Sequence, residues 1–136
     1  MMNLVPPHGS DSLQPLLLPK AERSDALQRA ESLKQVPMSS REVSDLLMLG
    51  MGAYTPLDGF MGEADWRGSC EDMHLADGLF WPIPITLSCA QALGDSIGIG
   101  EDVALVDGET DELLGILTVK DKYAIDAELE CSQVFR

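Results

Sequence analysis

The sequence predicts an α+β domain built on a small, mostly antiparallel β-barrel, with added helices mainly in the N-terminal half. The chain has 136 residues, of which 45% are hydrophobic, and this is the size of a single domain with its own core. Apolar residues recur at helical spacing in about residues 21–78, whereas short segments rich in β-formers follow in residues 79–125. Strands do not alternate with helices along the chain, so the pattern does not favour a parallel sheet.

The first segment, residues 1–20, is expected to be an extended arm that lies along a surface. Prolines with leucines between them are typical of such a segment, since proline is excluded from the interior of sheets. A helix is predicted from about Glu22 to Val36, and Pro37 is expected to stop it. Its apolar residues recur at helical spacing, and they are Ala26, Leu27, Ala30 and Leu33.

The start of the next helix is marked by a capping box, because Ser39 is followed three residues later by Glu42. Met38 stands where a hydrophobic staple would reach Val43. Gly50 and Gly52 are candidates for the left-handed C-cap. The residues expected on the buried face of this helix are Val43, Leu46, Leu47 and Gly50.

The stretch from Gly52 to Gly62, GAYTPLDGFMG, matches neither the helical nor the strand period. Pro56 holds Thr55 extended, and Asp58-Gly59 predicts a turn. Such a turn lets large side chains point into one core without a regular element, so we interpret the stretch as an internal plug between helices and barrel. Its large side chains are Tyr54, Leu57, Phe60 and Met61.

A third helix is predicted after the plug, with Trp66, Cys70 and Met73 on one face, although Gly68 lowers its helix propensity. A turn is predicted at Asp77-Gly78. Residues 21–78 are therefore expected to be mainly helical.

The barrel strands are expected in residues 79–125. Residues 79–87 predict a strand at a sheet edge or a bulge, because Pro82 and Pro84 cannot donate to a ladder. Residues 93–97 predict a turn into a further strand. Residues 103–106 and 113–119 flank the Asp107–Asp111 loop and predict a hairpin. The end of the chain, residues 126–136, predicts a helix whose candidate buried residues are Ala127, Leu129 and Val134.

The formal net charge of −14, from 23 acidic and 9 basic residues, opposes binding to nucleic acid and to anionic membranes. The apolar run from Leu16 to Leu18 is too short for a signal peptide or a membrane span. Cys70, Cys89 and Cys131 form neither a disulfide framework nor a zinc motif, which favours a reducing cytoplasm. Cys70 and Cys89 are expected to be small buried hydrophobes.

No catalytic, cofactor-binding or metal-binding residue is assigned from the sequence. His8 and His74 are separated by 65 residues and have no nucleophile beside them, so surface or capping roles explain them as well as catalysis. The Gly94–Gly100 stretch contains a Gly-x-Gly, but the strands expected on both sides are the wrong context for a phosphate loop. The acidic residues between Glu101 and Glu112 lack the spacing of a calcium-binding loop.

Five motifs occur in order along the chain, and together they resemble the amino-terminal domain of the ATP sulfurylase (sulfate adenylyltransferase) family. The resemblance runs from about Leu4 to Arg136, and three of the motifs are long, which makes it specific. The motifs are Leu4–Gly9 (LVPPHG), Ser40–Leu46 (SREVSDL), Gly52–Gly62, Leu75–Leu87 (LADGLFWPIPITL) and Gly115–Val119 (GILTV).

The resemblance implies a PUA-like barrel domain that precedes an α/β catalytic domain. The family joins sulfate to ATP, giving adenosine 5′-phosphosulfate and pyrophosphate, with ATP and magnesium as substrate of the whole enzyme. Its catalytic signature, Gln-x-Arg-Asn-Pro-x-His-x-x-His, does not occur in residues 1–136, so the catalytic domain is expected to be absent from this chain. The chain is therefore expected to hold no cofactor and to be inactive alone.

The partners implied by the resemblance are the catalytic domain and further copies of the protein, since the family is expected to form homo-oligomers. Two alternatives remain open. One is a free-standing PUA-like module that binds RNA or protein, which the acidic charge opposes. The other is a folded remnant or a regulatory interaction domain, for which a stop codon soon after Arg136 would be the mark.

Overall fold

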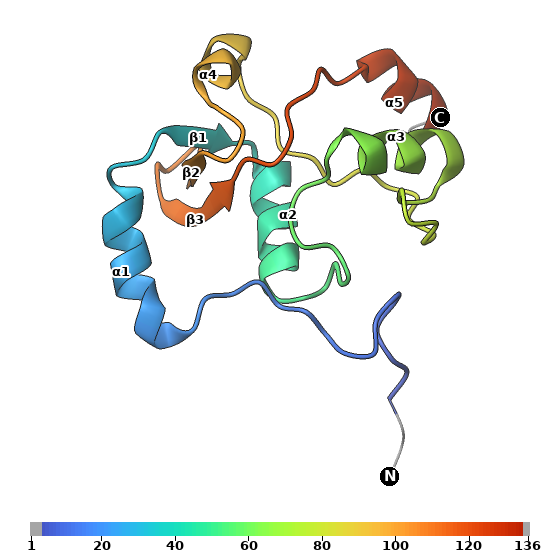
Figure 1. The fold of residues 1–136 in the computed structure, drawn as a ribbon, viewed down its shortest axis with the longest axis horizontal. Helices are drawn as coiled ribbons and strands as arrows, with labels where there is room; N and C mark the ends of the chain where they lie inside the picture. Colours follow the sequence, from blue (N-terminus) through green and yellow to red (C-terminus); the bar gives the residue numbers. More distant parts are fainter. Residues whose placement is uncertain (1–3, 135–136) are drawn as a thin grey trace.

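The computed structural model describes residues 4–134 as two groups of elements on either side of a central helix (Figure 1). The sheet, α1 and α4 lie on one side of α2, and α3 and α5 lie on the other. The elements in chain order are α1 (Lys20–Ala30), β1 (Gln35–Met38), α2 (Ser40–Gly50), α3 (Glu63–Asp72), α4 (Gln91–Ser96), β2 (Asp102–Asp107), β3 (Leu113–Thr118) and α5 (Ala127–Gln133).

The sheet has three strands in the order β1-β2-β3, so the α+β class is confirmed and the mostly antiparallel barrel is not. β1 pairs with β2 in parallel, with Val36 opposite Leu105, while β2 and β3 form the predicted antiparallel hairpin. The described part of the sheet is thus open and mixed. The parallel pair was missed because β1 was assigned to a helix, which hid the strand-helix-strand order of β1, α2 and β2.

The first predicted helix was too long, since α1 ends at Ala30 and residues 35–38 form β1. Val36 and Met38 are buried, whereas Gln35 and Pro37 are exposed, which is the alternation of a strand. Pro37 is tolerated because β1 lies at the edge of the sheet. The predicted apolar face of α1 is also partly wrong, because Leu27 is exposed.

The capping box of α2 is confirmed: the Ser39 hydroxyl accepts from the Glu42 N–H, and the Glu42 carboxylate accepts from the Ser39 N–H. Gly52 has the left-handed conformation predicted for it, with φ of 81°. The buried face is rotated from the prediction, because Leu49 is buried and Leu47 is exposed. Polar contacts, described below, hold the buried side of this helix.

The buried side chains form two clusters, and the plug lies between them. One cluster contains Trp66 and the plug residues Leu57 and Met61, and the other contains Val36 and Leu105 from the sheet. Phe60, which is half-buried, packs against both clusters. The internal position of the plug is therefore confirmed.

Replacing Phe60 with alanine should lower the free energy of unfolding by about 2–3 kcal/mol, below the range of about 3–5 kcal/mol for fully buried phenylalanines. The loss is expected because Phe60 packs against both clusters at once. Urea unfolding of the variant measures it. A midpoint identical to that of the wild type would mean that the plug does not join the two clusters.

The third helix, α3, is confirmed, with Trp66 and Cys70 buried. Met73 does not share their buried face, because it is an exposed C-cap with φ of 55°. The turn at Asp77-Gly78 is confirmed, since Gly78 has φ of 91° and its N–H donates to the Leu75 carbonyl.

Residues 79–87 do not form the predicted strand, and Phe80 makes only an isolated bridge to His74. The prolines that suggested an edge strand instead leave this segment extended without a ladder. Residues 93–96 of the predicted turn belong to the short helix α4, and Ile97 is its C-cap. α5 follows Asp126 as predicted, with Leu129 and Val134 half-buried but Ala127 exposed.

The arm prediction applies to residues 4–19, which contain no helix or strand, while residues 1–3 lie outside the described part of the chain. Residues 135–136 of the predicted last helix are also outside it. No helix formed by residues 4–134 has the length and apolar character needed to cross a bilayer.

Candidate functional site

The two histidines, which the sequence left far apart, contact the same residue. His8 Nε2 lies 2.7 Å from the Phe80 carbonyl oxygen, and the His74 ring packs edge-on against the Phe80 ring with centroids 5.8 Å apart. The His74 Nδ1 lies 2.5 Å from the Asp72 carbonyl oxygen. Both rings thus have backbone partners, an arrangement that orders the arm and the 72–80 loop.

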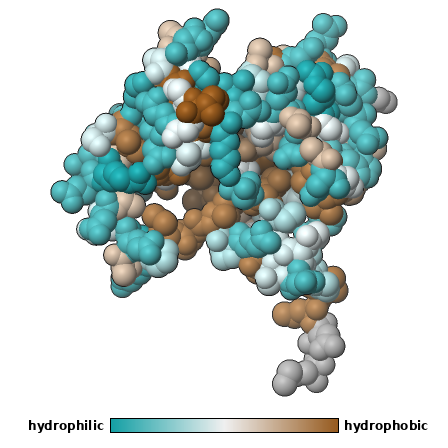
Figure 2. Space-filling model, viewed as in Figure 1, coloured by the Kyte–Doolittle hydropathy of each residue, from teal (hydrophilic) through white to brown (hydrophobic). Residues whose placement is uncertain are grey.

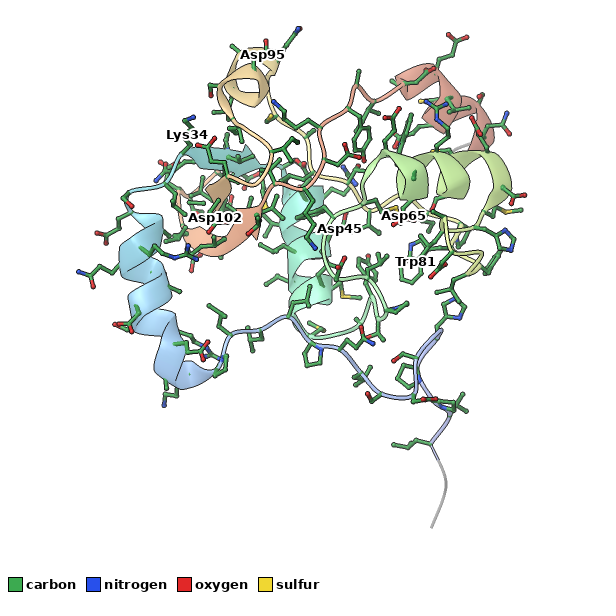
Figure 3. The ribbon with its side chains drawn as sticks, in the orientation of Figure 1. Lys34, Asp45, Asp65, Trp81, Asp95 and Asp102 are labelled. Atoms are coloured by element: carbon green, nitrogen blue, oxygen red, sulfur yellow. The ribbon has the colours of Figure 1, made fainter. Side chains whose placement is uncertain are left out.

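A cleft of about 390 Å³ opens beside His8. Its lining is mainly aromatic and apolar and includes Tyr54, Phe80, Trp81 and Ile83. Tyr54 and Trp81 meet edge to face at 5.9 Å between ring centroids, and His8 lies 6.1 Å from Trp81. Figure 3 shows Trp81 in the chain below α3. No sequence pattern identified this cleft, because its walls come from three separate segments of the chain.

A buried carboxylate lies behind the cleft. The Tyr54 hydroxyl donates to Asp45 Oδ1 at 3.1 Å, and Arg41 Nη1 lies 3.2 Å from the other oxygen of Asp45. Burial, and then the charge of Asp45, raise the pKa of Tyr54 above its ordinary value. Tyr54 is thus a neutral hydrogen-bond donor whose role is to fix the wall of the cleft.

A larger groove of about 1040 Å³ runs between the plug and the sheet. Its apolar wall includes Phe60, Leu87 and Ile97, and its polar rim includes Asp58 and Asp121. A volume of this size is in the range of small-molecule sites. The charges at the rim determine which ligands it could accept.

The lysines at the rim of this groove are already engaged. Lys122 Nζ donates to the carbonyl oxygens of Ile97 at 2.6 Å and Gly94 at 3.1 Å, and Lys120 lies 3.4 Å from a carboxylate oxygen of Asp58. Asp121 accepts from the Glu63 N–H at 2.8 Å and so caps α3. The groove consequently offers an anion little uncompensated positive charge.

The Gly94–Gly100 stretch begins inside α4 and continues into a turn, which the carboxylate of the next residue, Glu101, closes. The Gly98 N–H donates to Glu101 Oε2 at 2.7 Å. This hydrogen bond, followed by that from Lys34, lowers the pKa of Glu101. The amide that a phosphate would need is therefore bonded within the turn.

The acidic side chains of the hairpin region bond locally or across the sheet. In the loop, the Asp107 carboxylate accepts from the Glu109 N–H. The Asp102 carboxylate forms an ion pair with Arg29, a residue of α1, at 2.6 Å between Oδ2 and Nη1. Figure 3 shows Asp102 and Lys34 in the part of the molecule that holds the sheet. Within residues 4–134, no group of three or more metal-ligating side chains comes together.

Cys70 is buried, as predicted, and burial followed by the nearby charges of Glu130 and Glu71 raises the pKa of its thiol to about 11. Cys89 is exposed, which contradicts the sequence prediction, because the strand that was expected to bury it does not form. A thiol with a raised pKa is a poor nucleophile.

A family model described as a PUA-like domain matches residues 5–136. Sulfate adenylyltransferase from Syntrophobacter fumaroxidans is 58% identical over 99% of this chain and 33% of its own length. Sulfate adenylyltransferase from Chlorobaculum tepidum is 56% identical over 99% of this chain and 34% of its own length. The chain thus spans about a third of the length of these curated relatives.

The fold is also similar to a solved structure described as hexameric APS kinase from Thiobacillus denitrificans. The TM-score is 0.77 at 40% sequence identity, and the match covers 92% of this chain and 24% of the solved chain. The sequence and fold comparisons thus agree that similar domains occur as parts of longer chains.

Proposed function

The chain belongs to the PUA-like domain family, and we propose that it serves as the non-catalytic amino-terminal domain of a sulfate adenylyltransferase. That enzyme joins sulfate to ATP, giving adenosine 5′-phosphosulfate and pyrophosphate, by nucleotidyl transfer. The role proposed for residues 1–136 is to support a catalytic domain and to help the protein form an oligomer. The main observation behind this proposal is the 58% identity to a third of a sulfate adenylyltransferase.

The charge distribution supports a non-catalytic role. Attack of a sulfate oxygen on the α-phosphorus of ATP brings several negative charges together, so catalysis needs cationic side chains or a metal to stabilise them. This chain carries a net charge of −14, and the lysines at its larger groove are bonded to carbonyls and a carboxylate. We therefore assign no catalytic, cofactor or metal residue to it.

Isothermal titration of the 136-residue chain with ATP and magnesium is expected to give no binding in the micromolar range. An assay of pyrophosphate release with sulfate is likewise expected to show no turnover. The physical reason is the net negative charge and the absence of an uncompensated cationic pocket in the described residues. A micromolar dissociation constant for ATP would contradict the proposal.

A second candidate, a free-standing binding module, is favoured by one observation. The cleft beside His8 presents Tyr54 and Trp81, and aromatic side chains are platforms on which unpaired RNA bases stack. The charge of the chain opposes this candidate, because RNA affinity depends largely on neutralised phosphates. A gel-shift experiment with structured RNA at low salt distinguishes the two candidates. A shifted band supports the binding module, and an unshifted band supports the enzyme domain.

Two further proposals concern the surroundings of the chain. The similar solved structure is described as hexameric, which supports a homo-oligomer here. The free thiols of Cys70, Cys89 and Cys131 are compatible with the reducing cytoplasm.

A further inference from the structure

The cleft beside His8 is lined by three aromatic rings that we call the aromatic corner, those of Tyr54, Phe80 and Trp81. The planes of the Tyr54 and Trp81 rings lie at 87° to each other, with 5.9 Å between the ring centroids. Phe80 is 50% exposed, so a ligand can reach the cleft from solvent. The volume of about 390 Å³ is in the range of sites for small organic molecules.

The charge of the segments around the aromatic corner is negative. The lining of the cleft comes from three stretches, residues 4–19, 42–66 and 71–94, which contain Asp and Glu but no Lys or Arg. The guanidinium of Arg41, behind the cleft, is paired with Asp45 at 3.2 Å. Hydrophilic residues cover most of the face seen in Figure 2. The field of such carboxylates attracts cations and repels phosphate and sulfate groups.

The hydroxyl groups of the cleft already bond to the protein. The Tyr54 hydroxyl donates to Asp45 at 3.1 Å, and the Thr55 hydroxyl donates to the Gly52 carbonyl at 2.7 Å. No Asp or Glu side chain is part of the lining. A primary ammonium or a guanidinium would therefore lose hydrogen bonds to water without replacing them. A quaternary ammonium group has no N–H and loses none, so it is the cation that this cleft fits best.

We propose that the aromatic corner binds a quaternary ammonium group, such as the trimethylammonium group of choline, through cation–π contacts. The face of an aromatic ring is negative, and tryptophan attracts a cation more strongly than the other rings do. The bond from the Tyr54 hydroxyl to the Asp45 carboxylate makes the Tyr54 ring richer in electrons. Two rings at a right angle can contact a compact cation from two sides at once. The proposal does not rest on the enzyme-domain function, and its ligand is neither ATP nor sulfate.

The test is an NMR titration of the isotope-labelled 136-residue chain with choline chloride at constant chloride concentration. Choline is expected to bind with a dissociation constant on the order of 1 mM and to shift the indole N–H signal of Trp81. The indole N–H of Trp66, which is buried and donates to Glu130, is the internal reference and should not shift. The neutral alcohol in which carbon replaces the quaternary nitrogen has the same shape as choline, and it should bind at least about tenfold more weakly.

Substitutions that remove a ring but keep an apolar side chain test the cation–π contacts. Phe80→Leu should weaken choline binding about threefold, and Trp81→Leu should weaken it at least about tenfold. Ile83→Ala is the matched control, because Ile83 lines the same cleft and is 53% exposed but has no ring. It should leave the affinity within about twofold of wild type. Phe80 and Ile83 are both exposed, so circular dichroism of these two variants should show unchanged folding.

Three results would overturn the proposal. The first is no saturable shift of the Trp81 signal up to about 50 mM choline, far above the expected dissociation constant. The second is equal binding of choline and the neutral alcohol, since the contact would then be apolar only. The third is an equal loss of affinity in Phe80→Leu and Ile83→Ala. None of these results bears on ATP binding, so the enzyme-domain proposal is tested separately.

Discussion

Replacing Gly68 with alanine is expected to lower the free energy of unfolding by about 2–3 kcal/mol, although alanine is the better helix former. A Cβ at this position would lie 2.3 Å from the carbonyl oxygen of His74, a backbone atom that cannot rotate away. The His74 N–H also donates to the Gly68 carbonyl at 3.2 Å, so the end of α3 folds back closely on this glycine. Urea unfolding measures the loss.

Gly50→Ala is the control for this prediction, because Gly50 is also in a helix and no atom lies within 4 Å of its added Cβ. Its backbone is helical, so alanine should stabilise the protein by about 0.5–1 kcal/mol. The two glycine-to-alanine substitutions should therefore have opposite signs. If Gly68→Ala also stabilised the chain, the close approach of His74 would not constrain the helix.

The sequence predicted the elements that depend on neighbouring residues and missed those that depend on distant ones. Local rules located α2, α3, the hairpin and α5, because capping boxes, apolar spacing and turn residues act over a few neighbouring positions. They failed at β1 and at residues 79–87, where tertiary pairing decides the structure. Val36 and Met38 form a strand only because Leu105 and its neighbours lie alongside, and each of these partners is 69 positions away in the sequence.

The candidate site shows the same limit. The sequence left His8 and His74 as isolated residues, and it gave no reason to expect Phe80 between them. Likewise, nothing in the sequence marked Asp45 as more than one polar residue of a helix. The fold brings the Tyr54 hydroxyl to its carboxylate. The family resemblance could be found from the sequence because it rests on motifs of neighbouring residues. The clefts could not be found in this way, because they are formed by contacts between distant segments.

Glu42 holds two distant segments together with a buried carboxylate. It is only 3% exposed. One oxygen accepts from the Ser39 N–H at 3.0 Å and from the Ser39 hydroxyl at 2.7 Å. The other accepts from the Ser88 N–H at 2.6 Å and from the Ser88 hydroxyl at 3.2 Å. The capping box predicted the bond from the Ser39 N–H, and the two bonds from Ser88 connect α2 to the segment that leads into α4.

These bonds determine how Glu42 titrates. Burial alone would raise the pKa of the carboxyl, but the hydrogen bonds from the N–H groups and hydroxyls of Ser88 and Ser39 outweigh it and lower the pKa below its ordinary value of 4.5. A folded-state pKa below the unfolded value means that the carboxylate stabilises the fold above about pH 4.5. This contribution is lost as the pH falls through the lowered folded-state pKa.

Glu42→Gln is therefore expected to destabilise the protein by about 2–3 kcal/mol at pH 7, because the amide nitrogen would face N–H and hydroxyl donors that need an acceptor. The difference from wild type should shrink as the pH falls below 4.5, since protonated Glu42 loses the same charge-assisted bonds. Glu22→Gln is the matched control, because Glu22 is also in the first turn of a helix but is exposed, and it should change stability by less than about 0.5 kcal/mol. Urea unfolding of the three proteins between pH 3 and 7 measures these differences. A loss in Glu42→Gln that was the same at every pH would show that shape, and not the charge of the carboxylate, connects α2 to Ser88.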